Sequence, residues 1–242
     1  SHEELAWHTF EYSQSDSRLE VKVPILTPAQ MLLVTQSVKN ACNAQIKTMD
    51  VSEIVRAIDQ AILRLLDVNN EDRKCIDTLL PIATGMDATM LRFNFNQYLQ
   101  TFRALQLHRF IAEDFSNPKM LDEFQPRITG GWTKSVGAEL ITHIWAGNVP
   151  GLPLWSLISG LLVKSGTIGK VSSAEPICAS IFAKVLLEIE PRLANCLSII
   201  WWPNEDTITA IHLFQQSDIV LAYGGNLALA AVQAQVPVTT RF

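Results

Sequence analysis

Residues 140–163 read LITHIWAGNVPGLPLWSLISGLLV, a run of 24 residues without a formal charge. A run of this length could cross a bilayer as one helix. Pro150 and Pro153, together with Gly147 and Gly151, interrupt it in the middle. A lipid-facing helix cannot leave the freed backbone groups unpaired. The run therefore predicts a buried strand, a turn and a buried helix rather than a membrane span.

The same alternation continues toward the C-terminal residue. Short apolar runs alternate with longer stretches of helical periodicity, and the connections between them are short. Strands are expected at 140–145, 166–171, 197–202, 218–223 and 236–240, and helices at 152–162, 174–189, 205–216 and 226–235. This order implies right-handed crossovers and a parallel sheet with helices on both faces. The expected fold class is α/β, with a Rossmann-like sheet.

The first half of the chain has a different sequence pattern, in which helical periodicity dominates. Residues 1–125 are expected to be a mainly helical region packed on the sheet, and residues 126–242 the Rossmann-like part. Thr27, followed by Pro28 and Gln30, predicts a capped helix start, and Asp50 with Glu53 predicts a second. Further helices are expected at about 72–83 and 94–114.

Composition excludes several classes of protein. Lys and Arg total 19 and Asp and Glu total 24, so the net charge is −5 and no basic excess suits a nucleic acid. Hydrophobic residues make up 48% and charged residues 18%, which favours a packed interior over disorder. The four cysteines are far apart and include no CxxC pair; they are Cys42, Cys75, Cys178 and Cys196. We therefore expect neither a disulfide scaffold nor a structural metal site, and a reducing cytoplasm fits best.

Three strand-to-helix turns are expected on one rim of the sheet. They read AGNVPG at 146–151, GKVSS at 169–173 and YGGN at 223–226. Ligands of such sheets bind beyond the carboxyl ends of the strands. Each turn also has a plainer explanation, because glycines form tight turns, Asn148 suits a turn and Lys170 suits a solvated surface. Only their common placement favours a ligand site.

Other catalytic motifs are absent. The sequence contains no GxGxxG, GxSxG or HExxH pattern, and no cysteine follows a turn glycine or pairs with a nearby histidine. His143 lies within an apolar strand and is expected to be a hydrogen-bonded core histidine. The Trp201–Trp202 pair is interpreted as strand packing, and Cys178 and Cys196 as core residues.

The run HIWAGNVPG at 143–151, followed by GKVSSAEP at 169–176, resembles the acyl-CoA reductase family of the aldehyde dehydrogenase superfamily, the LuxC-type long-chain fatty-acid reductases of bacterial bioluminescence. DEFQP and SDIVLAYGGN extend the resemblance over about 122–242. It implies that Asn148 supplies an oxyanion hole and that Lys170 binds the adenosine ribose. It also implies that Gly224, Gly225 and Asn226 form the turn over the cofactor pyrophosphate.

Ser173 departs from the superfamily pattern. It stands where the NAD-binding members carry a glutamate that accepts a hydrogen bond from the ribose 2′-hydroxyl. A carboxylate at that place repels a 2′-phosphate, whereas a serine removes the repulsion and can donate a hydrogen bond. The resemblance therefore implies NADPH as cofactor, or tolerance of both dinucleotides.

The resemblance implies an enzyme that reduces a fatty acyl thioester such as acyl-CoA to an aldehyde. It further implies acyl-transferring protein partners and a homo-oligomer in the cytoplasm. The family's nucleophilic cysteine follows the cofactor turn, and the sequence stops at Phe242 first. We therefore expect the N-terminal part of a longer protein, inactive alone. Two alternatives stay open: a non-catalytic dinucleotide-binding or assembly module, and an aldehyde-oxidising dehydrogenase of the same superfamily.

Overall fold

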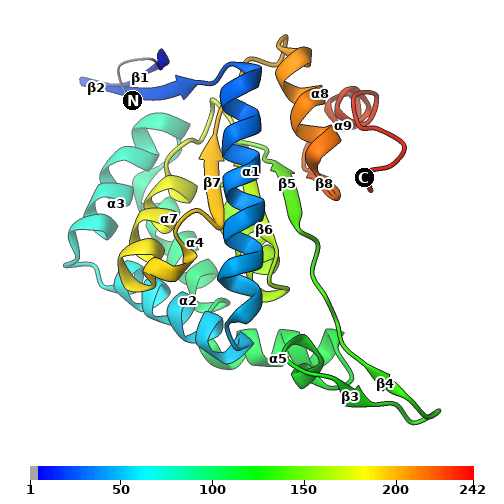
Figure 1. Cartoon of the computed structure of the whole chain (residues 1–242). Coiled ribbons are helices and arrows are strands. Elements are labelled where there is room, and N and C mark those ends of the chain that lie inside the picture. The colour runs from blue at the N-terminus through cyan, green and yellow to red at the C-terminus, as the bar shows by residue number, and fades with distance from the viewer. Residues whose placement is uncertain (1–4) are drawn as a thin grey trace.

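The computed structural model of the protein describes residues 5–242 (Figure 1). The N-terminal elements are β1 (Ala6–Gln14), β2 (Ser17–Ile25), α1 (Pro28–Ala44), η2 (Ile46–Thr48), α2 (Val51–Leu66), α3 (Glu71–Thr84), α4 (Ala88–Gln100), α5 (Ala104–Asp114) and η3 (Pro118–Leu121). The remaining elements are β3 (Gln125–Pro126), β4 (Trp132–Thr133), β5 (Leu140–Ile144), α6 (Leu152–Leu162), β6 (Gly166–Lys170), α7 (Cys178–Ile189), η4 (Pro191–Leu193), β7 (Leu197–Ile200), α8 (Thr207–Gln216), β8 (Ile219–Ala222) and α9 (Asn226–Gln233). The η elements are short 3₁₀ helices.

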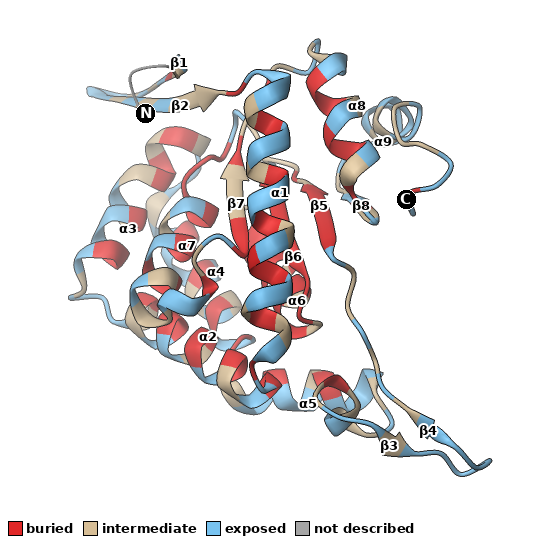
Figure 2. Ribbon diagram, in the orientation of Figure 1, coloured by how far each residue is buried: buried red, intermediate tan, exposed pale blue. Residues whose placement is uncertain are grey.

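A four-stranded parallel sheet lies at the centre, in the order β7-β6-β5-β8. Its register pairs Ile144 of β5 with Lys170 of β6 and with Ala222 of β8, so the strands end at one edge. Helices α1 and α8 pack on one face of the sheet, and α6 and α7 pack on the other (Figures 1 and 2). The expected α/β class with a parallel sheet is confirmed.

The uncharged run that suggested the fold occupies the core. Leu154, Leu157, Ile158 and Leu161 of α6 have no exposed surface, and each buried side chain of this size contributes roughly 1.5–3 kcal/mol. They belong to a cluster that joins α2, α5 and α7 to the sheet (Figure 2). Within residues 5–242, no helix is both long and apolar enough to cross a membrane.

Both expected helix starts are confirmed. Thr27 accepts a hydrogen bond from the Gln30 N–H at 3.2 Å, and the Gln30 side chain accepts one from the Thr27 N–H at 2.9 Å. At the start of α2, Glu53 accepts a hydrogen bond from the Asp50 N–H at 3.0 Å. Such reciprocal bonds pair the N–H groups that the first helical turn leaves free.

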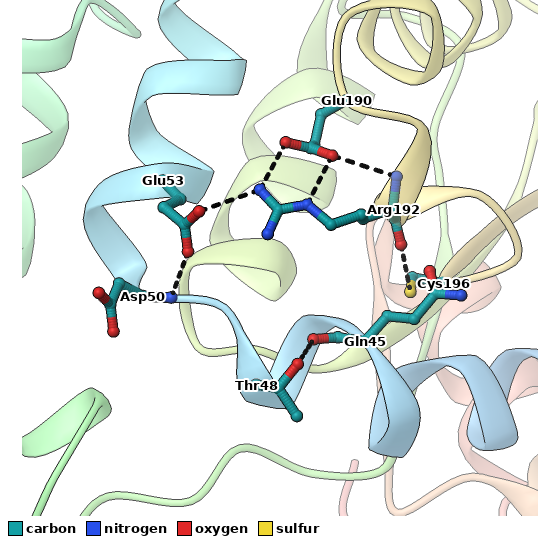
Figure 3. Close-up of polar contacts among 7 residues, drawn as sticks. All are labelled: Gln45, Thr48, Asp50, Glu53, Glu190, Arg192 and Cys196. Carbon is teal, nitrogen blue, oxygen red and sulfur yellow. Dashed lines mark hydrogen bonds and ion pairs between the residues drawn. The ribbon is translucent and has the colours of Figure 1, made fainter.

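Glu53 also links α2 to the segment that follows α7 (Figure 3). The Arg192 guanidinium lies 3.0 Å from Glu53 and 2.8 Å from Glu190. The Asp50 N–H and Arg192 lower the pKa of Glu53, and Arg192 lowers the pKa of Glu190. A single arginine thus joins two segments about 140 residues apart in sequence.

The expectation of a helical N-terminal region is wrong for its first part. Residues 6–25 form an antiparallel hairpin, β1–β2, in which Phe10 pairs with Val21. His8, Phe10 and Tyr12 alternate with outward-facing residues, which is the period of a strand rather than of a helix. The helical character begins at Pro28.

The long helix expected at 94–114 is two helices. It breaks between Gln100 and Ala104, where the Phe102 ring turns inward and becomes fully buried. Asp59 stabilises the new helix start because its carboxylate accepts hydrogen bonds from the Ala104 N–H at 2.8 Å and the Arg103 Nε at 2.5 Å. The helical periodicity of residues 94–114 cannot indicate this break, because it depends on a contact with Asp59, a residue far away in the sequence.

Two further boundaries differ from expectation. Helix α7 begins at Cys178 rather than at 174, because the Glu175 carboxylate accepts hydrogen bonds from the N–H groups of Ile177 and Cys178, each at 2.8 Å. No strand forms at 236–240. The Thr240 hydroxyl instead bonds to carbonyl oxygens at the end of α8, and parallel pairing with β8 occurs only at Arg241.

A two-stranded arm, β3–β4, projects from the body of the molecule (Figure 1). Its base is held by the Asp122 carboxylate, which lies 2.5 Å from the Lys164 Nζ and 2.9 Å from the Val51 N–H. The Lys164 side chain is almost fully buried. The arm is therefore anchored to both α2 and the α6–β6 connection.

Candidate functional site

A large cavity opens at the carboxyl edge of the sheet. Its volume is about 760 Å³, and it extends from the ends of β5, β6 and β7 to helices α8 and α9. Lys170, Ser173 and Gly224, from two of the three turns singled out in the sequence, line it together. The parallel strand order places these turns on one rim because β5 lies between β6 and β8.

Lys170 is the only lysine that lines this cavity among the described residues, and its side chain is largely buried. Its Nζ donates a hydrogen bond of 2.5 Å to the Asn204 Oδ1 and lies 4.9 Å from the centre of the Trp202 ring. Burial lowers the pKa of Lys170 to about 8, and the negative charge of Glu205 opposes part of this shift. The ammonium group can therefore donate further hydrogen bonds. An anionic ligand beside it would stabilise its charged form, which burial disfavours.

The turn at 171–176 is fixed by Tyr12 of the N-terminal hairpin and by the buried Glu175 carboxylate. The Tyr12 hydroxyl donates a hydrogen bond of 2.5 Å to the carbonyl oxygen of Ser173. Burial, reinforced by the charge of Glu175, raises the pKa of Tyr12 to about 12, so the hydroxyl keeps its proton. Glu175 is buried, and its other carboxylate oxygen has no partner among the described residues. Burial raises the pKa of Glu175.

Aromatic side chains form the outer wall of the cavity. The His8 ring stacks on the Trp201 ring at 4.5 Å between centres, and Phe10 meets the same indole edge-on at 5.1 Å. The Trp201–Trp202 pair thus does more than pack within a strand. The hairpin residues were not anticipated as site residues, although the alternation of His8, Phe10 and Tyr12 could have indicated an aromatic strand face.

Asn204 and Glu205 also line the cavity and were missed. They follow β7, so the rule that located Lys170 at the end of β6 applies to them equally. The predicted strand extends to residue 202 and the predicted helix begins at 205, so the sequence indicates a helix start here rather than a ligand-binding turn. Together they give Lys170 a neutral acceptor and a nearby carboxylate.

Asn148 lies in a second, adjoining cavity of about 470 Å³. It is exposed there together with Gly225, while Ala146 and Gly224 line both cavities. Asn226 is the exposed first residue of α9 and lines neither cavity. The structure therefore divides the anticipated site residues between two neighbouring cavities and leaves Asn226 outside both linings.

Two glycines shape this rim. Gly151 precedes α6 with a φ of +87°, a conformation that favours glycine, and a Cβ there would lie 3.0 Å from the Tyr98 ring. Gly169 faces Trp145, and a Cβ would come within 1.9 Å of the indole. Both positions therefore depend on the absence of a side chain.

None of the described cysteines lines either rim cavity. Cys178 and Cys196 are buried, as expected for core residues, and burial raises the pKa of both thiols. His143 is fully buried, and its Nδ1 is hydrogen-bonded to the Ser156 hydroxyl. Its Nε2 has no partner among the described residues, so the expectation of a hydrogen-bonded core histidine is met at one ring nitrogen only.

Comparison with known proteins shows the family to which the chain belongs. Residues 46–242 match the model of the family described as acyl-CoA reductase (LuxC). A long-chain acyl-protein thioester reductase from Photorhabdus laumondii is 28% identical over 126 residues, which are 51% of this chain and 26% of the relative. The corresponding protein from Vibrio harveyi is 31% identical over 90 residues, 36% of this chain and 19% of the relative. The match thus spans about a quarter or less of these relatives.

Solved structures share the fold at low sequence identity. A benzaldehyde dehydrogenase from Corynebacterium glutamicum superposes with a TM-score of 0.73 at 15% identity, over 98% of this chain and 50% of that one. A betaine aldehyde dehydrogenase from Staphylococcus aureus gives 0.75 at 13% identity, over 97% and 46%. The fold is therefore aldehyde dehydrogenase-like, and the chain belongs to the LuxC family of acyl-CoA reductases.

Proposed function

We propose that this chain is the cofactor-binding part of an NADPH-dependent reductase that converts long-chain fatty acyl thioesters to aldehydes. The observation that carries the proposal is the cavity at the sheet edge, where Lys170, Ser173 and Gly224 converge. Membership of the LuxC family supports the reaction class.

The residues of the large cavity fit a dinucleotide. Its volume of about 760 Å³ accommodates an adenosine moiety with phosphates, and α8 and α9 offer an apolar slot lined by Ala210, Phe214 and Val232. Helix α9 begins at Asn226, and its N-cap residue, Gly225, has no side chain to cap it, so the first N–H groups are free to bind a pyrophosphate. The bound cofactor would supply a hydride equivalent to the acyl carbon.

Lys170 and Ser173 support a preference for the 2′-phosphorylated dinucleotide. An ammonium group and a serine on one wall attract or tolerate a phosphate, whereas a carboxylate at position 173 would repel it. Glu205 lies near Lys170 and carries the opposite charge, which limits the preference. We therefore propose NADPH as the better ligand, with NADH binding more weakly.

Asn148 is proposed to bind the substrate carbonyl oxygen. It is an exposed residue that lines the second cavity, in the turn that precedes α6, and Gly224 lines both this cavity and the cofactor cavity. An amide N–H₂ directed at the developing oxyanion typically contributes ~2.7–4 kcal/mol of transition-state stabilisation. The nucleophilic cysteine is proposed to come from outside these 242 residues, since none of the described cysteines lines the rim cavities.

Equilibrium titration of the chain with NADPH and with NADH tests the proposal. Trp201 and Trp202 line the cavity, so we expect saturable quenching of their fluorescence, with tighter binding of NADPH. In the same samples, an acyl thioester is expected to yield no aldehyde, because none of the described cysteines lines the rim cavities. Absence of any quenching would reject the cofactor assignment, and aldehyde formation would reject the division of roles.

A further inference from the structure

A third cavity, of about 260 Å³, lies between α5, α6 and the exposed face of β8. It shares no lining residue with the two rim cavities. Its walls are mainly aliphatic and aromatic. They include Phe110 of α5 and Phe115 just after it, Leu162 of α6 and Val163 just after it, and Leu221 of β8. At roughly 30 Å³ per water-sized group, it has room for about eight such groups.

The interior of this cavity is uncharged. Asp114 is exposed at its edge, and His143 is the only other ionisable residue among the described lining. Burial lowers the pKa of His143 to about 3, so the imidazole is neutral. Its unpartnered Nε2 would lie only 3.5 Å from a Cβ at Gly160, another lining residue. A charged head group would lose its hydration there without gaining a counter-ion.

One face of α6 leads from the rim to this cavity. Leu152, Trp155, Ser159 and Val163 are the residues of this stretch that are only partly buried, and their spacing places them on one helical stripe. The stripe begins beside Gly151, three residues after Asn148, and its last two members line the cavity.

Aromatic rings connect the same two places. Tyr98 packs against Gly151 and lies 4.9 Å from Phe102, which in turn lies 6.0 Å from Trp155. Trp155 lies 4.8 Å from Phe110, which lines the cavity. A row of packed aromatic rings therefore runs beside the partly buried stripe of α6, from the rim to the third cavity. At 1.5 Å per residue, the 12 steps from Gly151 to Val163 correspond to about 18 Å.

We propose that the third cavity holds the distal end of the alkyl chain of an acyl thioester whose carbonyl lies at Asn148. The inference rests on the proposed function and adds the place where chain length is recognised. Neutral apolar walls suit methylene groups, and the distance from the rim selects a long chain over a short one.

The test uses two stable thioester analogues, the tetradecyl and hexyl thioethers of pantetheine, titrated calorimetrically below their micelle concentrations. Ser159→Phe projects a ring into the cavity and loses only a local hydrogen bond to the Trp155 carbonyl. Ser52→Phe, at an exposed position of α2, is the matched control. Leu221→Phe fills the cavity from β8 and serves if Ser159→Phe does not fold.

We expect the wild-type chain to bind the tetradecyl analogue far more tightly, since each buried methylene contributes about fourfold in affinity. Ser159→Phe should lower the affinity for the tetradecyl analogue by about 10- to 100-fold and leave the affinity for the hexyl analogue unchanged. Ser52→Phe should bind both analogues as the wild-type chain does. Equal effects on both analogues, or none on either, would overturn the inference alone. If the wild-type chain binds neither analogue while NADPH still binds, the acyl half of the proposed function fails with it.

Discussion

The Tyr12 hydroxyl donates a hydrogen bond of 2.5 Å to the carbonyl oxygen of Ser173, across 161 residues of sequence. This contact joins the N-terminal hairpin to the turn that carries the proposed cofactor-selecting serine. Ser173 itself is exposed and lines the large cavity, so the bond fixes the backbone from which its side chain projects. The hairpin thus contributes to the site as well as to the fold.

Tyr12→Phe removes this bond and keeps the ring. We expect a loss of about 1 kcal/mol in unfolding free energy and a weaker affinity for NADPH, because the turn gains freedom. Urea unfolding and NADPH titration measure the two effects. Ser13→Ala, on the outer face of the hairpin, is the control and should change neither. An unchanged NADPH affinity in Tyr12→Phe would show that the hairpin only supports the fold.

Ser173→Glu places a carboxylate where the 2′-phosphate is proposed to bind. We expect a loss of ~1–3 kcal/mol in NADPH affinity, partly screened because the turn is exposed, with NADH affected much less. The measurement is the ratio of the NADPH and NADH dissociation constants, compared between wild type and Ser173→Glu. A constant ratio would place the 2′ position elsewhere.

A helix-capping role for Ser173 is the competing explanation, and Ser173→Ala separates it. Helix α7 begins only at Cys178, and the hydroxyl that accepts the Ala174 N–H, at 3.2 Å, belongs to Ser172. We therefore expect Ser173→Ala to leave thermal stability unchanged. A clear fall in melting temperature would favour the capping role.

Lys164→Met breaks the buried ion pair with Asp122. The Asp122 carboxylate would keep the Val51 N–H but lose its cation, so we expect a loss of about 1–3 kcal/mol in unfolding free energy. Lys119→Met, at an exposed position of the same region, should stay close to wild type. Adding Asp122→Asn to Lys164→Met should recover part of the loss, because no buried charge then remains unpaired. A further loss instead would mean that Asp122 acts mainly through α2.

Acid should weaken the link between α2 and η4 (Figure 3). The pKa values of Glu53 and Glu190 are lowered in the folded protein, so both bind fewer protons there than in the unfolded chain. Their contribution is complete above the unfolded pKa of about 4.3 and is lost as the pH falls through the folded values. Arg192→Met should flatten this dependence in melting curves recorded from pH 7 to pH 3. An unchanged pH dependence would exclude the arginine as its source.

The second half of the fold followed from the sequence because local and tertiary preferences agree there. Strands at 140–144 and 166–170 and helix 152–162 are buried apolar runs bounded by glycine and proline, and the structure has them within a residue or two. The break at Phe102 and the start of α7 depend on Asp59 and Glu175, carboxylates that find their N–H partners only after folding. Such contacts leave no periodic pattern in the sequence.

The candidate site was predictable to the extent that it obeys strand order. Lys170, Ser173 and Gly224 meet because parallel strands end at one edge. His8 and Trp201 could not be paired beforehand, since their contact requires the hairpin to fold over the end of β7. The division between the cavity of Asn148 and that of Lys170 likewise depends on how side chains fill the rim.

The proposed function depends above all on binding of the adenosine 2′-phosphate end of NADPH in the cavity at Lys170. Calorimetric titration with adenosine 2′,5′-bisphosphate, on wild type, Lys170→Met and the exposed-site control Lys134→Met, tests it most directly. We expect one-site binding whose affinity falls about tenfold or more, ~1.4 kcal/mol, in Lys170→Met and is unchanged in the control. Wild-type affinity should also fall between pH 7 and pH 9, because the pKa of Lys170 is about 8 and the ammonium loses its charge in that range. Equal affinity in wild type and Lys170→Met, or no binding to the wild-type chain, would show that this cavity does not bind the 2′-phosphate.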